Sequence, residues 1–171
     1  MNLLFVCTGN TCRSPLAEVI GKAEARARGV ENVLCASAGT FARIGQGAAA
    51  SGIDVAAAHG LDLVNHISQP LTPMLLDWGD YLIGMDGSHV DRVRHIQSDL
   101  PVFLLTDFLP EDHAQYGHGV PDPYGGDLDV YRETYVLLEV AVRGLFDMLS
   151  VDKDLNVEGS LPPKLFPADD V

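Results

Sequence analysis

The segment that most constrains this chain is a loop-forming sequence that directly follows a short apolar run. Residues 3–6 read Leu-Leu-Phe-Val, which predicts a buried strand, and residues 7–14 read Cys-Thr-Gly-Asn-Thr-Cys-Arg-Ser. A chain that leaves such a strand and enters a helix must turn sharply, and Gly9 and Asn10 tolerate left-handed backbone conformations. We therefore expect successive backbone N–H groups to converge here as an anion-binding nest, with a helix N-terminus behind it.

The side chains of this loop predict chemistry at a phosphoryl group. Arg13 supplies a planar guanidinium that can bind two phosphate oxygens at once. The same positive field is expected to lower the pKa of Cys7 below the ordinary thiol value of about 8.5, so that a thiolate forms at neutral pH. Pro15 suits the first turn of the following helix, because it has no N–H to leave unpaired. Together these residues predict a cysteine nucleophile directed at phosphorus.

Length and charge narrow the class of protein. The chain has 171 residues, enough for one domain with a continuous core. Its 24 acidic and 11 basic residues give a net charge of −13, which argues against nucleic acid or an acidic membrane surface as partner. No apolar run approaches the roughly 20 residues that span a bilayer, and none resembles a signal peptide. Three cysteines without a disulfide framework predict a reducing, cytoplasmic location.

Strand-like and helix-like segments alternate along the chain. Strands are predicted at 3–6, 33–36, 81–85 and 102–105, and helices at 15–28, 47–59, 73–78, 88–97 and 129–149. The last helix is expected to bury a face made of Val130, Leu137, Leu138, Ala141 and Leu145. This alternation predicts an α/β fold with a parallel sheet covered on both faces and ligands at the carboxyl ends of its strands. Residues 1–150 form the expected domain, and residues 151–171 form an acidic, proline-containing tail.

A second candidate lies at residues 120–126, which read Val-Pro-Asp-Pro-Tyr-Gly-Gly. Attack by Cys7 on phosphorus requires a carboxylic acid that protonates the leaving atom and then accepts a proton from the water that cleaves the phosphocysteine. Asp122, held between two prolines, is suited to this role. Taken alone, an Asp-Pro pair would be an ordinary turn.

The two candidates together resemble the low molecular weight protein phosphatase family over residues 1–149. The matching segments are 6–15, 37–40 (Ser-Ala-Gly-Thr), 66–68 (His-Ile-Ser) and 122–124 (Asp-Pro-Tyr). The resemblance implies a three-layer fold with a four-stranded parallel sheet and neither metal nor cofactor. It implies that Cys7 is the nucleophile, Arg13 the phosphate clamp and Asp122 the general acid and then base. The implied supporting residues are Thr8, Gly9, Asn10, Thr11, Cys12 and Ser14 around the phosphate, with Ser14 bonded to the thiolate and Asn10, Ser37 and His66 bracing the loop.

Substrate preference depends on departures from the pattern of the phosphotyrosine members. Those members tend to have two adjacent aromatic residues after the Asp-Pro pair and a bulky aliphatic residue before the second loop cysteine. This chain has Tyr124 followed by two glycines, and Thr11 before Cys12, as in the protein-arginine phosphatase branch. Thr11 offers a hydroxyl and less bulk where a guanidinium must enter, and Phe41 and Tyr124 would flank the substrate side chain. Phosphoarginine is favoured, and phosphotyrosine remains the alternative.

Other function classes fit less well. Thioredoxin-coupled arsenate reductases share the loop and the fold, but they need further cysteines downstream, and none follows Cys35. A non-catalytic phosphopeptide-binding module would keep Arg13 without needing both Cys7 and Asp122. The expected partners are phosphorylated proteins, and the expected state is a monomer.

The remaining cysteines and histidines carry weaker signals. Cys35 lies in a predicted strand and is expected in the core. Cys12 either packs or forms a reversible disulfide with Cys7 that protects the nucleophile, and the sequence leaves both readings open. His113 and His118 lack the spacing of a metal site and are expected in a solvated loop.

Overall fold

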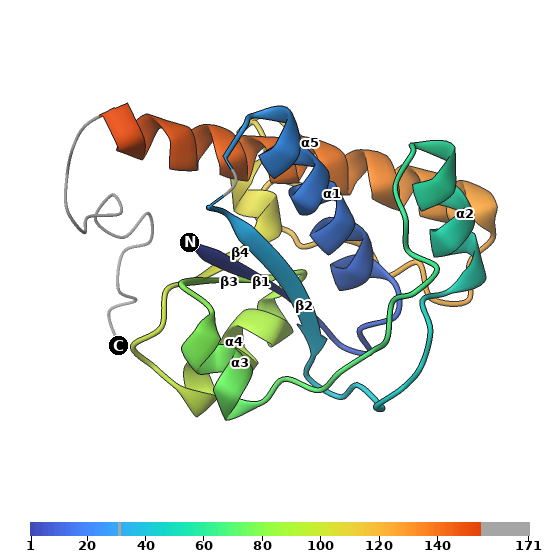
Figure 1. The fold of residues 1–171 in the computed structure, drawn as a ribbon, viewed down its shortest axis with the longest axis horizontal. Helices are drawn as coiled ribbons and strands as arrows, with labels where there is room; N and C mark the ends of the chain where they lie inside the picture. Colours follow the sequence, from blue (N-terminus) through green and yellow to red (C-terminus); the bar gives the residue numbers. More distant parts are fainter. Residues whose placement is uncertain (31, 155–171) are drawn as a thin grey trace.

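The chain folds around one sheet of four parallel strands, in the order β2-β1-β3-β4 (Figure 1). The computed structural model describes residues 1–30 and 32–154. The strands are β1 (Asn2–Cys7), β2 (Leu34–Gly39), β3 (Tyr81–Gly84) and β4 (Val102–Leu104). All three pairings are parallel, and helices cover both faces. The predicted three-layer α/β class is therefore confirmed.

Within the described part of the chain, five α-helices lie on the two faces of the sheet. Helices α1 (Arg13–Ala27), α2 (Ala50–Ala58) and α5 (Leu128–Asp154) lie on one side, and α3 (Pro73–Trp78) and α4 (Gly87–Ile96) lie on the other (Figure 1). A short 3-10 helix, η1 (Leu105–Phe108), follows β4. None of the helices within these described residues is long and apolar enough to cross a membrane.

Helix boundaries follow the predictions to within a few residues. Helix α3 spans the predicted range, with the Thr72 hydroxyl accepting from the Leu75 N–H at 3.3 Å as its N-cap. Helix α2 begins at Ala50 rather than at residue 47, because the backbone of its N-cap Ala49 is extended, with φ −59° and ψ 139°. The Ala49 N–H donates to the Thr11 carbonyl at 2.9 Å. Helix α5 continues to Asp154, past the predicted end at residue 149, and the rest of the predicted tail (155–171) lies outside the described residues.

The central strand β1 is buried on both faces and contributes side chains to both hydrophobic cores. Leu3, Phe5 and Cys7 belong to the core beneath α1 and α5, whereas Leu4 and Val6 belong to the core beneath α3 and α4. This double burial explains why the strand reads as a continuous apolar run instead of an alternating one. The strand delivers Cys7 to the carboxyl edge of the sheet, on the side of α1.

The buried face of α5 differs from the predicted one at its start. Leu138, Ala141 and Leu145 are buried as expected, but Val130 is 39% exposed. Tyr131, one position later, is the residue that faces inward, and its hydroxyl contacts the Cys12 thiol at 3.1 Å. The apolar-periodicity argument missed this because a tyrosine can bury its ring when its hydroxyl finds a polar partner.

Candidate active site

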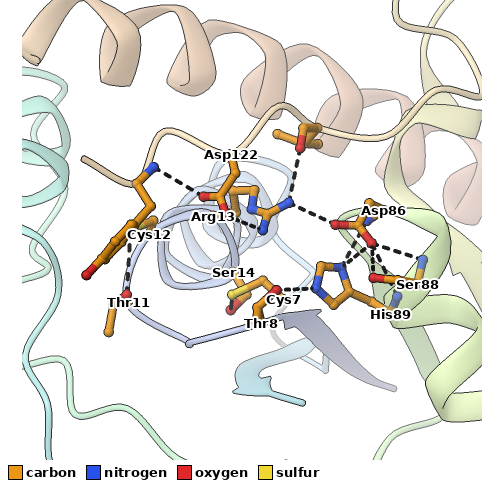
Figure 2. A network of polar contacts seen from close by, with 12 residues as sticks. Cys7, Thr8, Thr11, Cys12, Arg13, Ser14, Asp86, Ser88, His89 and Asp122 are labelled. Carbon is orange, nitrogen blue, oxygen red and sulfur yellow. Dashed lines mark hydrogen bonds and ion pairs between the residues drawn. The ribbon is translucent and has the colours of Figure 1, made fainter. Parts of the chain in front are cut away.

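The loop between β1 and α1 wraps around the Cys7 sulfur, which is almost entirely buried (Figure 2). The Asn10 N–H donates to the sulfur at 3.2 Å, and the Ser14 hydroxyl lies 2.9 Å from it. Of the two residues expected in the left-handed region, only Asn10 is there, with φ 54°. Gly9 instead lines the pocket, where its lack of a side chain leaves space open. The turn therefore depends on an asparagine, which tolerates this conformation when its amide is bonded locally.

Asn10 is fully buried and connects the loop to its surroundings. Its side-chain nitrogen donates to the hydroxyls of Ser14 at 3.0 Å and Ser37 at 2.9 Å. Its side-chain oxygen accepts from the Gln69 N–H at 2.9 Å, and its carbonyl accepts from His66 Nε2 at 2.8 Å. The structure thus brings together the three residues expected to brace the loop. Asn10 and Ser14, however, are fully buried and are absent from the pocket lining.

Gly39, at the end of β2, lets the loop approach the sheet closely. A Cβ atom at this position would lie 2.5 Å from the Thr8 carbonyl oxygen and 2.9 Å from the Asn10 nitrogen. The Phe41 N–H also donates to the Thr8 carbonyl at 2.9 Å. Sequence analysis assigned Gly39 no role of its own, because such an approach between distant backbone segments is invisible in one sequence.

Arg13 is a buried residue, and its guanidinium is held by two carboxylates. Nη2 donates to Asp122 Oδ2 at 2.8 Å, and Nη1 donates to Asp86 Oδ2 at 3.0 Å and to the Val120 carbonyl at 3.2 Å (Figure 2). The sequence predicted Arg13 and Asp122 but missed Asp86, which lies at the end of β3 and caps α4. Both acids come from loops at the carboxyl edge of the sheet, where the fold predicts ligand binding.

The electrostatics of Cys7 differ from the prediction. Burial raises the pKa of the Cys7 thiol and outweighs the lowering effects of the Ser14 and Asn10 hydrogen bonds and of the Arg13 charge. The expectation of a lowered pKa is therefore wrong for this arrangement. The physical reason is that the folded loop removes the sulfur from water, which disfavours the charged thiolate. Asp86 shows the converse: burial raises its pKa, but the Ser88 hydrogen bond and the neighbouring His89 and Arg13 side chains outweigh burial and lower it.

A pocket of about 450 Å³ opens above the Cys7 sulfur. Its lining consists of Cys7, Thr8, Gly9, Thr11, Cys12, Arg13, Gln46, Gly47, Ala49, Asp122 and Tyr124. Of the three residues expected to set specificity, Thr11 and Tyr124 line it. Phe41 does not, and is 76% exposed on the neighbouring loop. The sequence did not predict Gln46, Gly47 and Ala49 as part of the lining, because no motif marks them. The Ala49 N–H donates to the Thr11 carbonyl, which holds this segment beside the pocket.

The remaining cysteines and histidines occupy other environments. All three cysteines are free thiols, and burial raises the pKa of Cys35 to about 12, as suits the predicted core position. The Cys12 thiol pairs with Tyr131, so a Cys7–Cys12 disulfide stays a prediction. His113 Nδ1 accepts from the Gln115 N–H within its own loop. Across residues 1–30 and 32–154, no three metal-ligating side chains gather as a metal site would require.

Comparison with known proteins identifies the family. The family described as low molecular weight phosphotyrosine protein phosphatase matches residues 2–157, nearly the whole chain. The chain belongs to this family. The resemblance based on the Cys7 loop and the Asp122 segment is thus confirmed, and so is the assignment to cysteine-dependent low molecular weight phosphatases.

Relatives within the low molecular weight phosphatases carry two kinds of name. The protein-arginine-phosphatase of Bacillus subtilis is 36% identical over 155 residues, covering 90% of this chain and 99% of its own. Low molecular weight protein-tyrosine phosphatase A of Mycobacterium tuberculosis is 33% identical over 162 residues, covering 93% and 96%. A solved structure of YwlE arginine phosphatase, in which serine replaces a cysteine and the active-site serine is phosphorylated, has a TM-score of 0.81 and 34% identity. That match covers 91% of this chain and all of the other.

Proposed function

We propose that the protein hydrolyses phosphorylated side chains of proteins through a phosphocysteine intermediate on Cys7, with phosphoarginine as the favoured substrate. The observation that carries the proposal is the convergence of three groups on one pocket. The Cys7 sulfur lies at its base, the Arg13 guanidinium lies beside it, and the Asp122 carboxylate is bonded to that guanidinium at 2.8 Å. A nucleophile, an anion clamp and an acid are the groups that phosphoryl transfer through a covalent intermediate requires.

In the first step the substrate phosphate replaces the carboxylate of Asp122 on Arg13. The Cys7 thiolate, stabilised by the Ser14 hydroxyl and the Asn10 N–H, attacks phosphorus. The sulfur–phosphorus bond forms as the bond from phosphorus to the leaving nitrogen or oxygen breaks. Before the attack, the Cys7 thiol loses its proton to Asp122, which the phosphate has released from its ion pair. Asp122 then donates this proton to the leaving atom. Arg13 and the loop N–H groups hold the remaining phosphate oxygens as charge moves.

In the second step water cleaves the phosphocysteine. Asp122, now a carboxylate, accepts a proton from the water as the oxygen bonds to phosphorus and the sulfur–phosphorus bond breaks. The products are inorganic phosphate and the Cys7 thiolate. Because Cys7 must stay reduced in this cycle, we place the enzyme in a reducing compartment, the cytoplasm. We propose that it acts there as a monomer on phosphorylated proteins.

The preference for phosphoarginine is supported by the walls of the pocket. Thr11 places a short, polar side chain in the lining, and Tyr124 is followed by Gly125, whose φ of 78° turns the chain away. A guanidinium needs polar partners, and the Asp122 carboxyl group, once released from Arg13, would supply an acceptor oxygen. Phosphotyrosine is the second candidate, because Tyr124, 79% exposed, presents a ring on which a phenyl group could stack.

The test compares turnover of phosphoarginine and phosphotyrosine peptides of matched sequence, with Cys7→Ser as control. We expect the larger kcat/KM for phosphoarginine, and for Cys7→Ser a loss of turnover to below about one percent. A phosphorylated protein should be trapped by acid quench from wild type and identified at Cys7 by mass spectrometry. Turnover retained by Cys7→Ser would overturn the mechanism, and a larger kcat/KM for phosphotyrosine would overturn the substrate assignment alone.

A further inference from the structure

The side chain of Thr8 is held by a residue that the mechanism above does not use. Thr8 lines the pocket next to Cys7, and its Oγ1 lies 2.9 Å from Nε2 of His89 (Figure 2). His89 lies in the first turn of α4, 81 residues away in sequence, and is 1% exposed. The two residues meet because β1, which precedes Thr8, pairs with β3, which precedes α4. A buried imidazole is thus held against one hydroxyl of the phosphate-binding loop.

The hydrogen bonds of His89 fix which ring nitrogen carries the proton. The Asp86 backbone N–H donates to Nδ1 at 3.1 Å, and an N–H can only donate. Asp86 Oδ1 also lies 3.1 Å from Nδ1, but it already accepts from the N–H groups of Ser88 and His89 and from the Ser88 hydroxyl. Nδ1 is therefore the acceptor and Nε2 carries the proton. Burial lowers the pKa of His89, assisted by Arg13 and opposed by the carboxylates of Asp86 and Asp122, so the ring stays neutral.

This tautomer determines the direction of the Thr8 hydroxyl. Because Nε2–H donates, Oγ1 of Thr8 accepts, and the hydroxyl proton must point to another partner. Thr8 is exposed and lines the pocket together with its sequence neighbours Cys7 and Gly9. Since the Thr8 hydroxyl accepts from His89 and lines an anion-binding pocket, its proton is available to donate to a phosphate oxygen.

We infer that the Thr8 hydroxyl is a further hydrogen-bond donor to the bound phosphoryl group, and that His89 is a positioning residue that aims it. The inference rests on the proposed phosphoryl-binding role of the pocket. It adds to that role a side-chain donor beyond the backbone nest and Arg13.

Asp86 links this donor to the guanidinium. Its Oδ2 accepts from Arg13 at 3.0 Å, while its Oδ1 accepts from the N–H groups of Ser88 at 3.0 Å and His89 at 3.3 Å. The same capping box that begins α4 therefore holds both Arg13 and, through His89, Thr8. One helix N-terminus positions two donors of the phosphate-binding loop.

The test measures the affinity of inorganic phosphate by calorimetry at fixed salt, with melting curves to verify folding. Thr8→Val removes the hydroxyl at nearly constant shape, and Thr8→Ser keeps it. We expect Thr8→Val to weaken phosphate binding about tenfold, the usual effect of losing a hydrogen bond to a charged group, and Thr8→Ser to bind like wild type. Phosphate affinity unchanged in Thr8→Val would overturn the inference.

Two substitutions at His89 test the roles of its two ring nitrogens separately. His89→Asn keeps an acceptor near Nδ1 for the Asp86 N–H but loses the donor to Thr8, whereas His89→Gln keeps a donor near Nε2. We expect His89→Asn to weaken phosphate binding, His89→Gln to retain most of it, and His89→Asn to add nothing in the Thr8→Val background. Equal losses for both His89 variants, or losses that multiply in the double variant, would overturn the positioning role. If His89→Asn does not fold, the two Thr8 variants and His89→Gln decide the question.

The measurement also separates this inference from the proposed function. Calorimetry with inorganic phosphate needs no turnover, so an unchanged affinity in Thr8→Val would contradict the donor role even if phosphopeptides are hydrolysed. Conversely, an absence of turnover in wild type would contradict the phosphatase mechanism whatever the phosphate affinities are.

Discussion

Arg13 and Asp122 form a direct ion pair, with Nη2 of the guanidinium 2.8 Å from Oδ2 of the carboxylate. The two residues are 109 positions apart, and they are proposed to bind opposite ends of the reacting bond. Arg13 is 5% exposed at its side chain, whereas Asp122 is 49% exposed and can swing away. The pair therefore couples phosphate binding to release of the acid, because a phosphate on Arg13 displaces the carboxylate.

The first prediction compares the two carboxylates that share Arg13. Asp122→Asn should lower kcat by about 10²- to 10⁴-fold, the usual contribution of a general acid, while phosphate inhibition stays the same or becomes stronger. Asp86→Asn removes a charge from the same guanidinium and keeps an N-cap, so it serves as the matched control. It should lower kcat much less. Equal losses of kcat in the two variants would show that Asp122 acts only by holding Arg13.

The second prediction concerns the ionisation of Cys7. Since the Ser14 hydrogen bond lowers the pKa of the thiol against the effect of burial, Ser14→Ala should raise that pKa. The rate of alkylation by iodoacetamide should then reach its plateau at higher pH than in wild type. Ser37→Ala, which loses a bond to Asn10 but does not touch the sulfur, is the control and should shift the profile less. A profile that moves to lower pH in Ser14→Ala would contradict the argument.

The third prediction concerns Thr11 in the pocket lining. Thr11→Ile adds bulk and removes the hydroxyl, so it should depress kcat/KM for phosphoarginine relative to phosphotyrosine by roughly 10- to 200-fold. Thr11→Ser keeps the hydroxyl without the added bulk and should stay near the wild-type ratio. The measurement is the ratio of kcat/KM for the two matched peptides. A ratio unmoved by Thr11→Ile would reduce Thr11 to a packing residue.

The fourth prediction concerns Gly39, where an added Cβ would meet the Thr8 carbonyl at 2.5 Å. Gly39→Ala should lower the free energy of unfolding by about 1–3 kcal/mol and reduce phosphate affinity, because the loop must shift. Gly87→Ala, at a position where nothing lies within 4 Å, is the control. It should leave the free energy of unfolding unchanged or slightly higher. Denaturant unfolding and phosphate calorimetry on both variants make the comparison.

Much of the fold could be predicted because local sequence patterns, such as apolar runs and helix-capping residues, indicate its strands and helices. The apolar run before Cys7 is continuous, since β1 is covered on both faces, and such a run followed by a turn sequence indicates a buried parallel strand. The start of α3 is predicted by Thr72-Pro73, a cap and a first-turn proline. The start of α2 differed from the prediction because the chain before Ala50 is extended at Ala49, whose N–H donates to the Thr11 carbonyl of the phosphate-binding loop.

The residues of the site that the sequence missed are those whose role depends on contacts between distant segments. Asp86 and His89 form the capping box of α4, which involves only local residues. Only the packing of β3 beside β1 brings them to Arg13 and Thr8. The sign of the Cys7 pKa shift was missed for a related reason, because a single sequence does not reveal how completely the folded loop buries the sulfur.

The dense bonding of Asn10 has a consequence for the thermodynamics of recognition. With its backbone and side chain tied to Cys7, Ser14, Ser37, His66 and Gln69, the loop gives up its conformational freedom when the protein folds. A ligand then meets an already ordered ring of donors and loses little affinity to ordering it. Selectivity among phosphorylated side chains is thereby left to the rim, while the anion cradle beneath can stay the same whichever side chain is dephosphorylated.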